Sequence, residues 1–489
     1  MINLIKNEIV KILKKKSFYI ILIVTVLFMV FYNFMTSRNT NTSMYTRYGS
    51  YSTSYVQSMR DYVKELNPEH PEDVTAYIEA KSLVDCFDLV DKYGGDTWQA
   101  YIIMRDGISY TRNLYLYAYG TEKSDPLREQ AQTDYEEFVA LLDKDDWRYF
   151  VEQEKQKLEE EMKIQEDLKA QTKDSVQLES IQAEINRLSI SKQALDWRLE
   201  KNIPYGYDSM NDNLNQYIYN KAMCLDYESK DNMTYEEKQE YQQALETTEI
   251  AKYRIENGEP SERIENFQYG MTGILSNYEI FIIIILVMIA GTIVSEEFNK
   301  GTVKLLLVRP YSRTKILLAK WIACVLIFLL AVLCIAVAQF IIGGILFGWE
   351  GVTQSNIIQY DFNLSTVVEF TWWQYLGILF ITKLPLYLLV MTIAFALSTI
   401  FTNSAFAIVI ALLGYMSTSI INALATAYQI DILRYFITMN WNIDQYLFGA
   451  LPPFEGMTLA FSIIICILYF LVLMLASVIA FKKKNIKNI

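Results

Sequence analysis

The chain has 489 residues, of which 52% are hydrophobic and 20% charged, and its formal net charge is −12. Such a length exceeds that of one ordinary soluble domain. Residues 38–275 hold 27 of the 44 basic residues and 46 of the 56 acidic ones, a net of −19, which leaves 17 basic against 10 acidic residues, a net of +7, elsewhere. An acidic block inside an apolar, mildly basic chain indicates two environments and argues against a nucleic-acid partner.

The chain begins with a basic amphipathic segment, residues 1–16, followed by an apolar run over residues 18–34. This run resembles a signal peptide, but no small-x-small cleavage site follows it, so an uncleaved span is favoured. Crossing ~30 Å of hydrocarbon takes about 20 apolar helical residues. Five further runs qualify, the first of them with Asn277 and Tyr278 added in front: 280–294, 316–347, 372–401, 405–425 and 459–481. We therefore predict an all-α membrane protein with six transmembrane helices.

The Lys and Arg residues near the ends of the runs predict the orientation, because basic loops stay in the cytoplasm. Basic residues gather before the first run, between the second and third, and after the sixth, whereas the loop 350–371 has acidic residues and no Lys or Arg. We therefore expect a plasma-membrane protein with both termini in the cytoplasm and residues 37–275 outside.

The acidic block is predicted to be a mostly helical extracytoplasmic domain between the first and second spans. Pairs Thr133–Glu136 and Thr234–Glu237 match the capping box of a helix start. Gly94 and Gly258 are predicted to end helices. Apolar stripes over residues 151–168 and 178–199, joined by the polar stretch 171–175, predict a helical hairpin, which either reaches a partner or packs on its own domain.

Two of the five cysteines, Cys86 and Cys224, lie in this block and could form a disulfide if the block faces an oxidising compartment. The sequence leaves that pairing open. The single histidine, His70, lies between two prolines and is interpreted as a surface turn residue.

The segment directly after the second run, residues 296–313, combines charges with an apolar stretch. Gly301 allows the chain to turn as it leaves the bilayer, and it is expected to adopt a positive φ. Thr302 can cap a new helix, and Pro310 ends it. Without further information, the segment is either a helix that docks on a protein or a basic interfacial helix that anchors the loop.

The segment resembles the ABC-2 permease pattern, in which an acidic residue ends the second span, Gly-Thr follows, and an amphipathic piece leads to Pro-x-x-Arg. The residues that match this pattern are Glu297, Gly301, Thr302, Leu306, Pro310 and Arg313, with Glu296 and Arg309 beside them. The six-span order and the amphipathic N-terminus are also similar to that family. The resemblance covers residues 1–36 and 276–489, and it implies that this segment couples the chain to an ATPase.

The chain itself is not expected to be an enzyme or to hold a cofactor. The phosphate-binding motif G-x-x-x-x-G-K-[ST] requires a Gly-Lys dipeptide, and the sequence contains none. The resemblance therefore implies that ATP is bound by a separate ABC ATPase subunit. It also implies a second permease chain, as a homodimer or a heterodimer, and contact with membrane lipid.

Two residues of the fourth run interrupt its apolar character. Lys383 would be a costly buried ammonium unless it is paired or near water, so it is either a pathway or interface residue or a side chain that snorkels or pairs with a polar neighbour. Pro385 removes a helical hydrogen bond and could kink the span. The loop 426–455 is amphipathic and is expected to lie half-inserted at the outer surface.

The domains predicted from these features are residues 1–36, the outer domain 37–275 and the five-helix part 276–489. The favoured function is the permease subunit of an ABC-2 exporter for an antimicrobial peptide, drug, lipid or ion. The alternative is a membrane-anchored sensor or immunity protein whose outer domain binds a peptide without transport. A membrane enzyme lacks support, because no catalytic set is visible.

Overall fold

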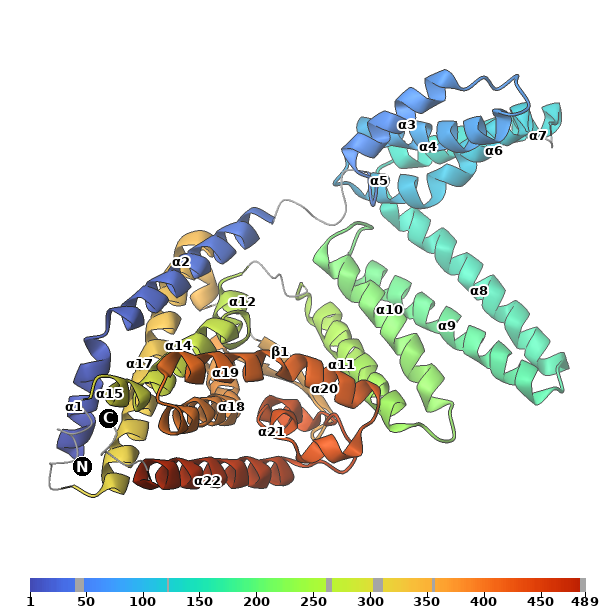
Figure 1. The fold of residues 1–489 in the computed structure, drawn as a ribbon. Helices are drawn as coiled ribbons and strands as arrows, with labels where there is room; N and C mark the ends of the chain where they lie inside the picture. The colour runs from blue at the N-terminus through green and yellow to red at the C-terminus, as the bar shows by residue number, and fades with distance from the viewer. Residues whose placement is uncertain (40–47, 121–122, 261–265, 302–310, 354–356, 484–489) are drawn as a thin grey trace. The chain divides into compact units, whose positions relative to one another are not determined.

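The computed structural model describes residues 1–39, 48–120, 123–260, 266–301, 311–353 and 357–483. The chain divides into two compact units (Figure 1): Met1–Arg38 with Arg263–Ile489, and Asn39–Glu262. The second unit ends before the predicted limit of residue 275. The reason is that Phe267 packs its ring against Phe340 and Trp372, with ring centroids 5.4 and 5.8 Å away, and thus belongs to the membrane unit.

The first unit, called the membrane unit below, is almost entirely helical. Its elements are α1 (Ile2–Leu13), α2 (Lys16–Asn39), α12 (Phe267–Thr272), α13 (Ile274–Asn277), α14 (Glu279–Thr292), α15 (Ser295–Asn299), α17 (Arg313–Phe347), η2 (Glu350–Val352), β1 (Ile357–Asp361), β2 (Thr366–Phe370), α18 (Trp372–Ile400), α19 (Ser404–Met416), α20 (Thr418–Ala427), η3 (Asp431–Tyr435), α21 (Ile437–Asn440), η4 (Ile443–Gly449) and α22 (Leu459–Lys483).

Within the described residues, five helices are long and apolar enough to cross a membrane: Lys16–Arg38, Arg313–Phe347, Trp372–Ile400, Ser404–Ala427 and Leu459–Lys483. The fourth of these combines α19 and α20. The second run predicted from the sequence forms α14, which has 14 residues. At 1.5 Å per residue α14 is about 21 Å long, so by itself it is shorter than the hydrocarbon layer.

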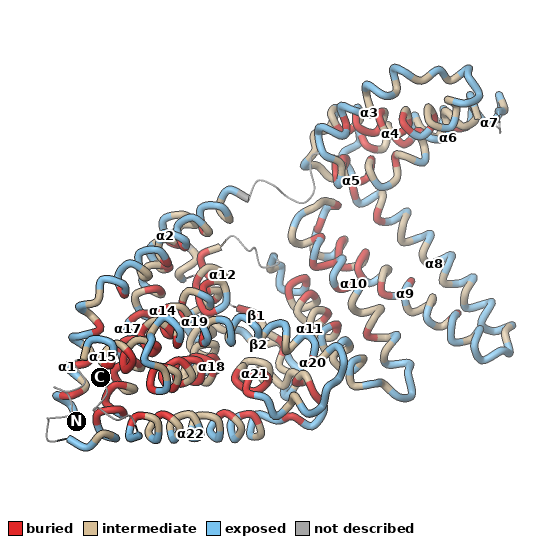
Figure 2. The backbone as a smooth tube through the Cα atoms, viewed as in Figure 1, coloured by how far each residue is buried: buried red, intermediate tan, exposed pale blue. Residues whose placement is uncertain are grey.

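Helix α14 lies in the core of the membrane unit, in contact with α17, α18 and α19. It is apolar on all sides, as expected for a helix surrounded by other helices. Figure 2 shows buried residues gathered on α14, α17 and α18, whereas α2 is mostly exposed or intermediate. The exposed apolar side chains of α2 are therefore available to lipid.

A buried polar triad attaches α2 to this core. Asn33 of α2 donates to Gln339 of α17 at 3.0 Å and to the hydroxyl of Tyr278 at 2.8 Å. The Gln339 amide donates back to Asn33 at 2.9 Å. Hydrogen bonds of this kind join helices in a membrane, where apolar contact alone gives little preference for protein over lipid.

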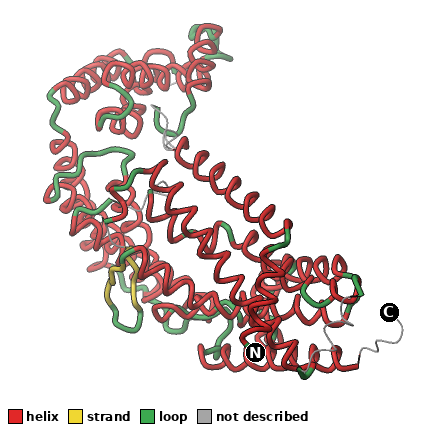
Figure 3. Tube along the Cα trace, turned by 90° about the vertical axis from the view of Figure 1, so that its left-hand side faces the viewer, coloured by secondary structure: helices red, strands yellow, loops and turns green. Residues whose placement is uncertain are grey.

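One β-hairpin interrupts the helical architecture (Figure 3). Strands β1 and β2 pair antiparallel, with Ile357 opposite Phe370 and Asp361 opposite Thr366. The hairpin lies in the stretch 350–371, which the sequence analysis treated only as an acidic loop. Alternating apolar and polar residues with several β-branched side chains favour strands in this stretch, and this pattern could have predicted the hairpin. The predicted all-α class is confirmed, and this short hairpin is the exception to it among the described residues.

The second unit, called the outer domain below, is a helical bundle within its described residues. Its helices are α3 (Thr53–Glu65), α4 (Val74–Tyr93), α5 (Trp98–Ile102), η1 (Ile103–Gly107), α6 (Ile108–Tyr119), α7 (Asp125–Asp143), α8 (Trp147–Gln171), α9 (Ser175–Glu200), α10 (Ser209–Glu228) and α11 (Tyr235–Asn257). Helix α9 joins two hydrophobic cores, since Leu195 belongs to one with Phe138 and Trp197 to the other with Tyr217.

Most local predictions for this domain are confirmed. Helices α8 and α9 form the predicted hairpin, and Lys192 pairs with Glu159 across it at 2.9 Å. Thr234 and Glu237 make both hydrogen bonds of a capping box. The capping box predicted at Thr133 is wrong: α7 already begins at Asp125, and the Thr133 hydroxyl donates to the carbonyl of Glu129 inside the helix.

Candidate functional site

Helix α15 continues the chain beyond α14 and carries the two glutamates of the predicted coupling segment. The backbone N–H of Ser295, its first residue, donates to the Ser398 hydroxyl of α18 at 3.0 Å. The buried ring of Phe298 meets that of Phe481 in α22, with centroids 6.2 Å apart. Because α15 is attached to α18 and α22, the glutamates between these two attachments are held in place.

Both glutamates bind lysines from the N-terminal segment. Glu296 accepts hydrogen bonds from Lys15, in the short link between α1 and α2, and from Lys300, the latter at 2.6 Å. Glu297 accepts from Lys11 of α1 at 2.8 Å. The N-terminal segment is therefore joined to α15 by two ion pairs, one from α1 and one from the link after it.

Behind these pairs lies Lys320 of α17, whose side chain is fully buried. Its Nζ lies 2.7 Å from Glu8 and 2.8 Å from Glu297, and it donates to the Ile293 carbonyl at 3.3 Å. A buried ammonium is costly unless it is paired, and here three acceptors face its three donors. We call the following residues the charge cluster: Glu8, Lys11, Lys15, Glu296, Glu297, Lys300 and Lys320.

Nearby opposite charges keep Glu8, Lys11 and Glu296 of the charge cluster ionised at neutral pH. Burial by itself would raise the pKa of Glu8, but Lys320 and Lys11 outweigh it and lower the pKa. Burial would lower the pKa of Lys11, but its hydrogen bonds to carboxylates raise it. The same balance between burial and nearby lysines lowers the pKa of Glu296. The cluster therefore acts as a set of ion pairs.

The structure describes both ends of the coupling segment, and both ends belong to the membrane unit. Gly301 has φ +67°, so the predicted positive φ is confirmed, and among the described residues other than its chain neighbours no atom lies within 4 Å of the position of an added Cβ. Arg313 begins α17, and its guanidinium donates to the Lys482 carbonyl of α22 at 2.8 Å. The remaining predicted coupling residues lie outside the described residues: Thr302, Leu306, Arg309 and Pro310.

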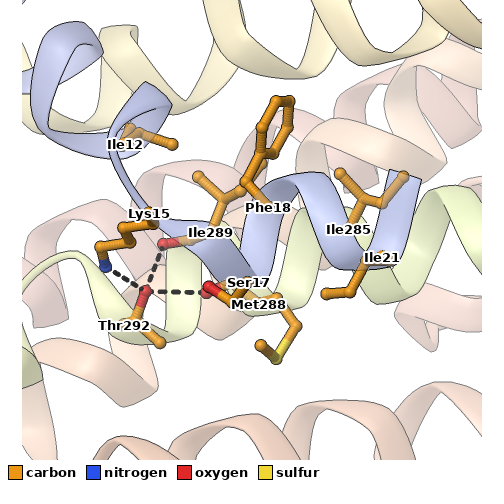
Figure 4. A pocket seen from close by; sticks show the side chains of 9 residues that line it. All are labelled: Ile12, Lys15, Ser17, Phe18, Ile21, Ile285, Met288, Ile289 and Thr292. Carbon is orange, nitrogen blue, oxygen red and sulfur yellow. Dashed lines mark hydrogen bonds between the residues drawn. The ribbon is translucent and has the colours of Figure 1, made fainter. Parts of the chain in front are cut away.

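A pocket of about 370 Å³ opens beside the charge cluster. Its lining comes from α1, α15 and the ends of their neighbours: Glu8, Lys11, Ile12, Lys14, Lys15, Ile293, Glu296, Glu297 and Lys300. Figure 4 shows a narrow slot that shares Ile12 and Lys15 with this pocket and is otherwise mostly apolar. In the slot, Lys15 donates to Thr292 at 2.9 Å, while Phe18 of α2 and Ile285 of α14 contribute to the apolar lining.

A second buried lysine, Lys383, lies in α18. Its Nζ is 3.0 Å from Glu279 at the start of α14 and 3.3 Å from Asp444 of η4. The Tyr415 hydroxyl of α19 donates to the other carboxylate oxygen of Glu279. The interpretation of Lys383 as a residue paired with polar neighbours is therefore confirmed, and a role in a pathway stays a prediction. Helix α18 continues through Pro385 without a break.

The disulfide considered between Cys86 and Cys224 is not formed, because both residues are free, buried thiols. Cys86 of α4 lies 3.5 Å from the Thr111 hydroxyl, and Cys224 of α10 lies 3.8 Å from the Thr248 hydroxyl. Each thiol thus faces a neighbouring helix other than the one that carries the second cysteine.

The buried residues that pair with Lys11 and Glu297 were not predicted from the sequence. Glu8 and Lys320 were not predicted as site residues, although each is conspicuous. Glu8 is the single acidic residue among residues 1–36, and Lys320 is the single charged residue of the run 316–347. An isolated charge in an apolar or oppositely charged stretch requires a partner, which is the signal that could have identified the pair.

The fold and the buried ion pairs define the class of this protein: a multi-pass membrane protein built from α-helices. Its helical spans surround charged side chains that pair with one another, which is the arrangement expected when ionisable groups enter an apolar layer.

Comparisons with known proteins agree with this class. Residues 245–487 match a family model described as a protein of unknown function, DUF2705. YhcI, an uncharacterised protein of Bacillus subtilis strain 168, is 33% identical over 247 residues, which cover 50% of this chain and 76% of YhcI. YdbK, an uncharacterised membrane protein of the same organism, is 27% identical over 225 residues, 46% of this chain and 85% of YdbK. No solved structure matches the chain. The chain belongs to the same protein family as YhcI.

Proposed function

We propose that this chain is the permease subunit of an ABC-2 type exporter, powered by ATP that a separate subunit hydrolyses. The observation that carries the proposal is segment 296–313, whose sequence resembles the ABC-2 coupling pattern. Both described ends of this segment are built into the membrane unit, through the charge cluster at Glu296 and Glu297 and through the contact of Arg313 with Lys482. A segment attached at both ends can pass the movement of a docked ATPase to α14 and α17.

The proposed topology places both termini and the coupling segment in the cytoplasm and the outer domain outside the plasma membrane. The support is the distribution of basic residues around the spans and the acidic net charge of the outer domain. In this topology the five long apolar helices provide five crossings of the membrane. Helix α14, extended by its short neighbours α12, α13 and α15, provides one more, which is the second in chain order.

The proposed assembly contains two permease chains, identical or related, and an ABC ATPase pair. A single chain supplies the spans but lacks the Gly-Lys dipeptide of a phosphate-binding loop. The cargo class follows from the family resemblance alone: an antimicrobial peptide, a drug, a lipid or an ion.

Purification of the tagged chain from its native membranes tests the proposal. We expect an ATPase with a Walker A motif to co-purify, and we expect ATP hydrolysis to disappear when the Walker A lysine of that partner is substituted. The chain alone should show no nucleotide-saturable hydrolysis. Hydrolysis by the pure chain, or export that persists after the partner is deleted, would contradict the proposal.

A pocket in the outer domain favours a second candidate, peptide binding without transport. It has a volume of about 630 Å³, and its lining includes Tyr119 and the ion pair of Arg112 with Glu79, whose charged atoms lie 2.8 Å apart. If the chain is a sensor or immunity protein, Arg112→Ala should abolish protection of cells against a peptide, and deletion of the ATPase should leave that protection intact.

A further inference from the structure

We propose that the pocket beside the charge cluster binds the headgroup of an anionic phospholipid, with the start of its acyl chain against the slot between α2 and α14. This inference rests on the membrane class of the protein and goes beyond the proposed transport function. The ligand is a membrane lipid, and a free phosphate compound is the alternative source of the same chemistry.

The first observation is the balance of charge at the pocket. Four lysines line it, and Lys320 stands directly behind it, against three glutamates, so positive charge is in excess by two. The glutamates are already engaged: Glu8 and Glu297 both accept from Lys11 and Lys320, and Glu296 accepts from lysines on either side. An anion therefore meets a net attraction at this pocket.

The second observation is the donor capacity that remains. Each ammonium carries three donors. The ammonium of Lys14 makes no hydrogen bond or ion pair in the described part of the chain, and it lines the pocket from an exposed position. Lys15 uses two donors, on Glu296 and Thr292, which leaves a third. These two neighbouring lysines can together bind a phosphate group.

The third observation is the position of the pocket at a polar–apolar boundary. The slot in Figure 4 begins at Lys15 and Ser17 and continues along Phe18, Ile285 and Met288. Beyond it, α2 presents exposed apolar side chains such as Ile23, which is 56% exposed. A lipid fits this arrangement, because its headgroup can contact the lysines while its acyl chain contacts the apolar helix surface. A soluble anion can contact the lysines alone.

Titration of the purified full chain, freed of lipid in a neutral detergent, tests the proposal. Binding of phosphatidylglycerol, phosphatidylcholine and glycerol phosphate is followed by native mass spectrometry and by the melting temperature. We expect one phosphatidylglycerol per chain to bind more tightly than phosphatidylcholine. Glycerol phosphate should bind more weakly than the lipid, because it lacks the chain.

Matched variants separate a site from general attraction of a basic helix to anionic lipid. Lys14→Gln should weaken phosphatidylglycerol binding by about fivefold, the effect of one lysine near a phosphate. Lys6→Gln is the control, because Lys6 is exposed on α1, which ends one residue before Lys14, and does not line the pocket. Met288→Trp, which fills the slot, should weaken lipid binding, unlike Ile23→Trp on the exposed face of α2.

Three outcomes would overturn the proposal. Equal losses in Lys14→Gln and Lys6→Gln would mean surface attraction without a site. Glycerol phosphate that binds as tightly as the lipid would mean a free-anion site. Phosphatidylcholine that binds as tightly as phosphatidylglycerol would mean that the excess positive charge has no role.

Discussion

Lys320 is a fully buried, paired ammonium in the membrane unit. Its fully buried ammonium lies between Glu8 and Glu297, and Lys11 faces the same two carboxylates, so the charges of these four residues cancel. Such a quartet is tolerated in a low-dielectric region only while all its members are present. The buried ammonium of Lys320 therefore needs the N-terminal helix for its pairing, and the N-terminal helix needs Lys320 for its attachment.

Substitution of Lys320 by Met should destabilise the protein strongly. It leaves two buried carboxylates with Lys11 as their shared partner, and loss of one partner of a buried pair costs about 3–5 kcal/mol. The melting temperature of the purified chain should fall, and Glu8→Gln combined with Lys320→Met should recover part of the loss. Lys315→Met, at an exposed position of the same helix, is the control. Equal stability of Lys320→Met and Lys315→Met would contradict the described pairing.

Acid should loosen the N-terminal helix through Glu8. The pKa of Glu8 is lower in the folded chain than in the unfolded chain, so its contribution to stability is complete above the ordinary value of about 4.5 and is lost as the pH falls through the folded pKa. Melting temperatures measured from pH 7 to pH 3 should fall less steeply in Glu8→Gln than in the wild type. Parallel curves for the two proteins would contradict this assignment.

At the scale of elements, periodicity and composition predicted the five long apolar helices, the α8–α9 hairpin and several helix ends. These features depend on local residues: apolar runs of sufficient length, a capping box at Thr234, and glycines after α4 and α11. The β-hairpin at residues 357–370 was missed because loop charge alone was considered. The short length of α14 was missed because an apolar run does not reveal where its helix begins and ends.

The candidate site was predictable only in part. The match to the ABC-2 pattern identified Glu296, Glu297 and Gly301, whose positions depend on local sequence. Two of their partners, Lys11 and Lys15, lie 286 and 281 positions away in the chain. Glu8 and Lys320, 312 positions apart, meet where α1 contacts α17. A single sequence indicates that each charge in an apolar stretch needs a partner. It does not show which opposite charge the fold places beside it.

Helices α4 and α10 of the outer domain make their cysteines unreactive. Burial raises the pKa of Cys86 to about 12 and raises that of Cys224 as well, so neither forms a thiolate readily at neutral pH. A maleimide should label neither cysteine in the folded protein and both in denaturant. Lys238→Cys, at an exposed position of α11, is the positive control. Rapid labelling of native Cys86 would show that α4 does not pack as described.

At the scale of the whole molecule, the chain combines an acidic helical domain with an apolar, mildly basic membrane unit. The two units have separate hydrophobic cores. The family match at residues 245–487 covers the membrane unit from α12 onward and the end of α11 in the outer domain.

The proposed topology predicts different labelling on the two sides of the membrane. On intact cells, a membrane-impermeant maleimide should label Lys238→Cys in the outer domain and should not label Lys315→Cys at the start of α17 until the membrane is opened. The native cysteines give a low background, since four of the five are buried. Labelling of position 315 from outside would reverse the orientation and remove the coupling role.

The coupling role of segment 296–313 is tested most directly by the amount of ATPase that co-purifies with two variants of Gly301. The φ of +67° is strained for valine, by about 1–2 kcal/mol or more, but accessible to asparagine, and no described residue beyond the chain neighbours crowds the Cβ that either side chain adds. At equal expression, Gly301→Asn should retain the ATPase and export, and Gly301→Val should lose one or both. Full ATPase binding and full export by Gly301→Val would show that the segment is only a linker.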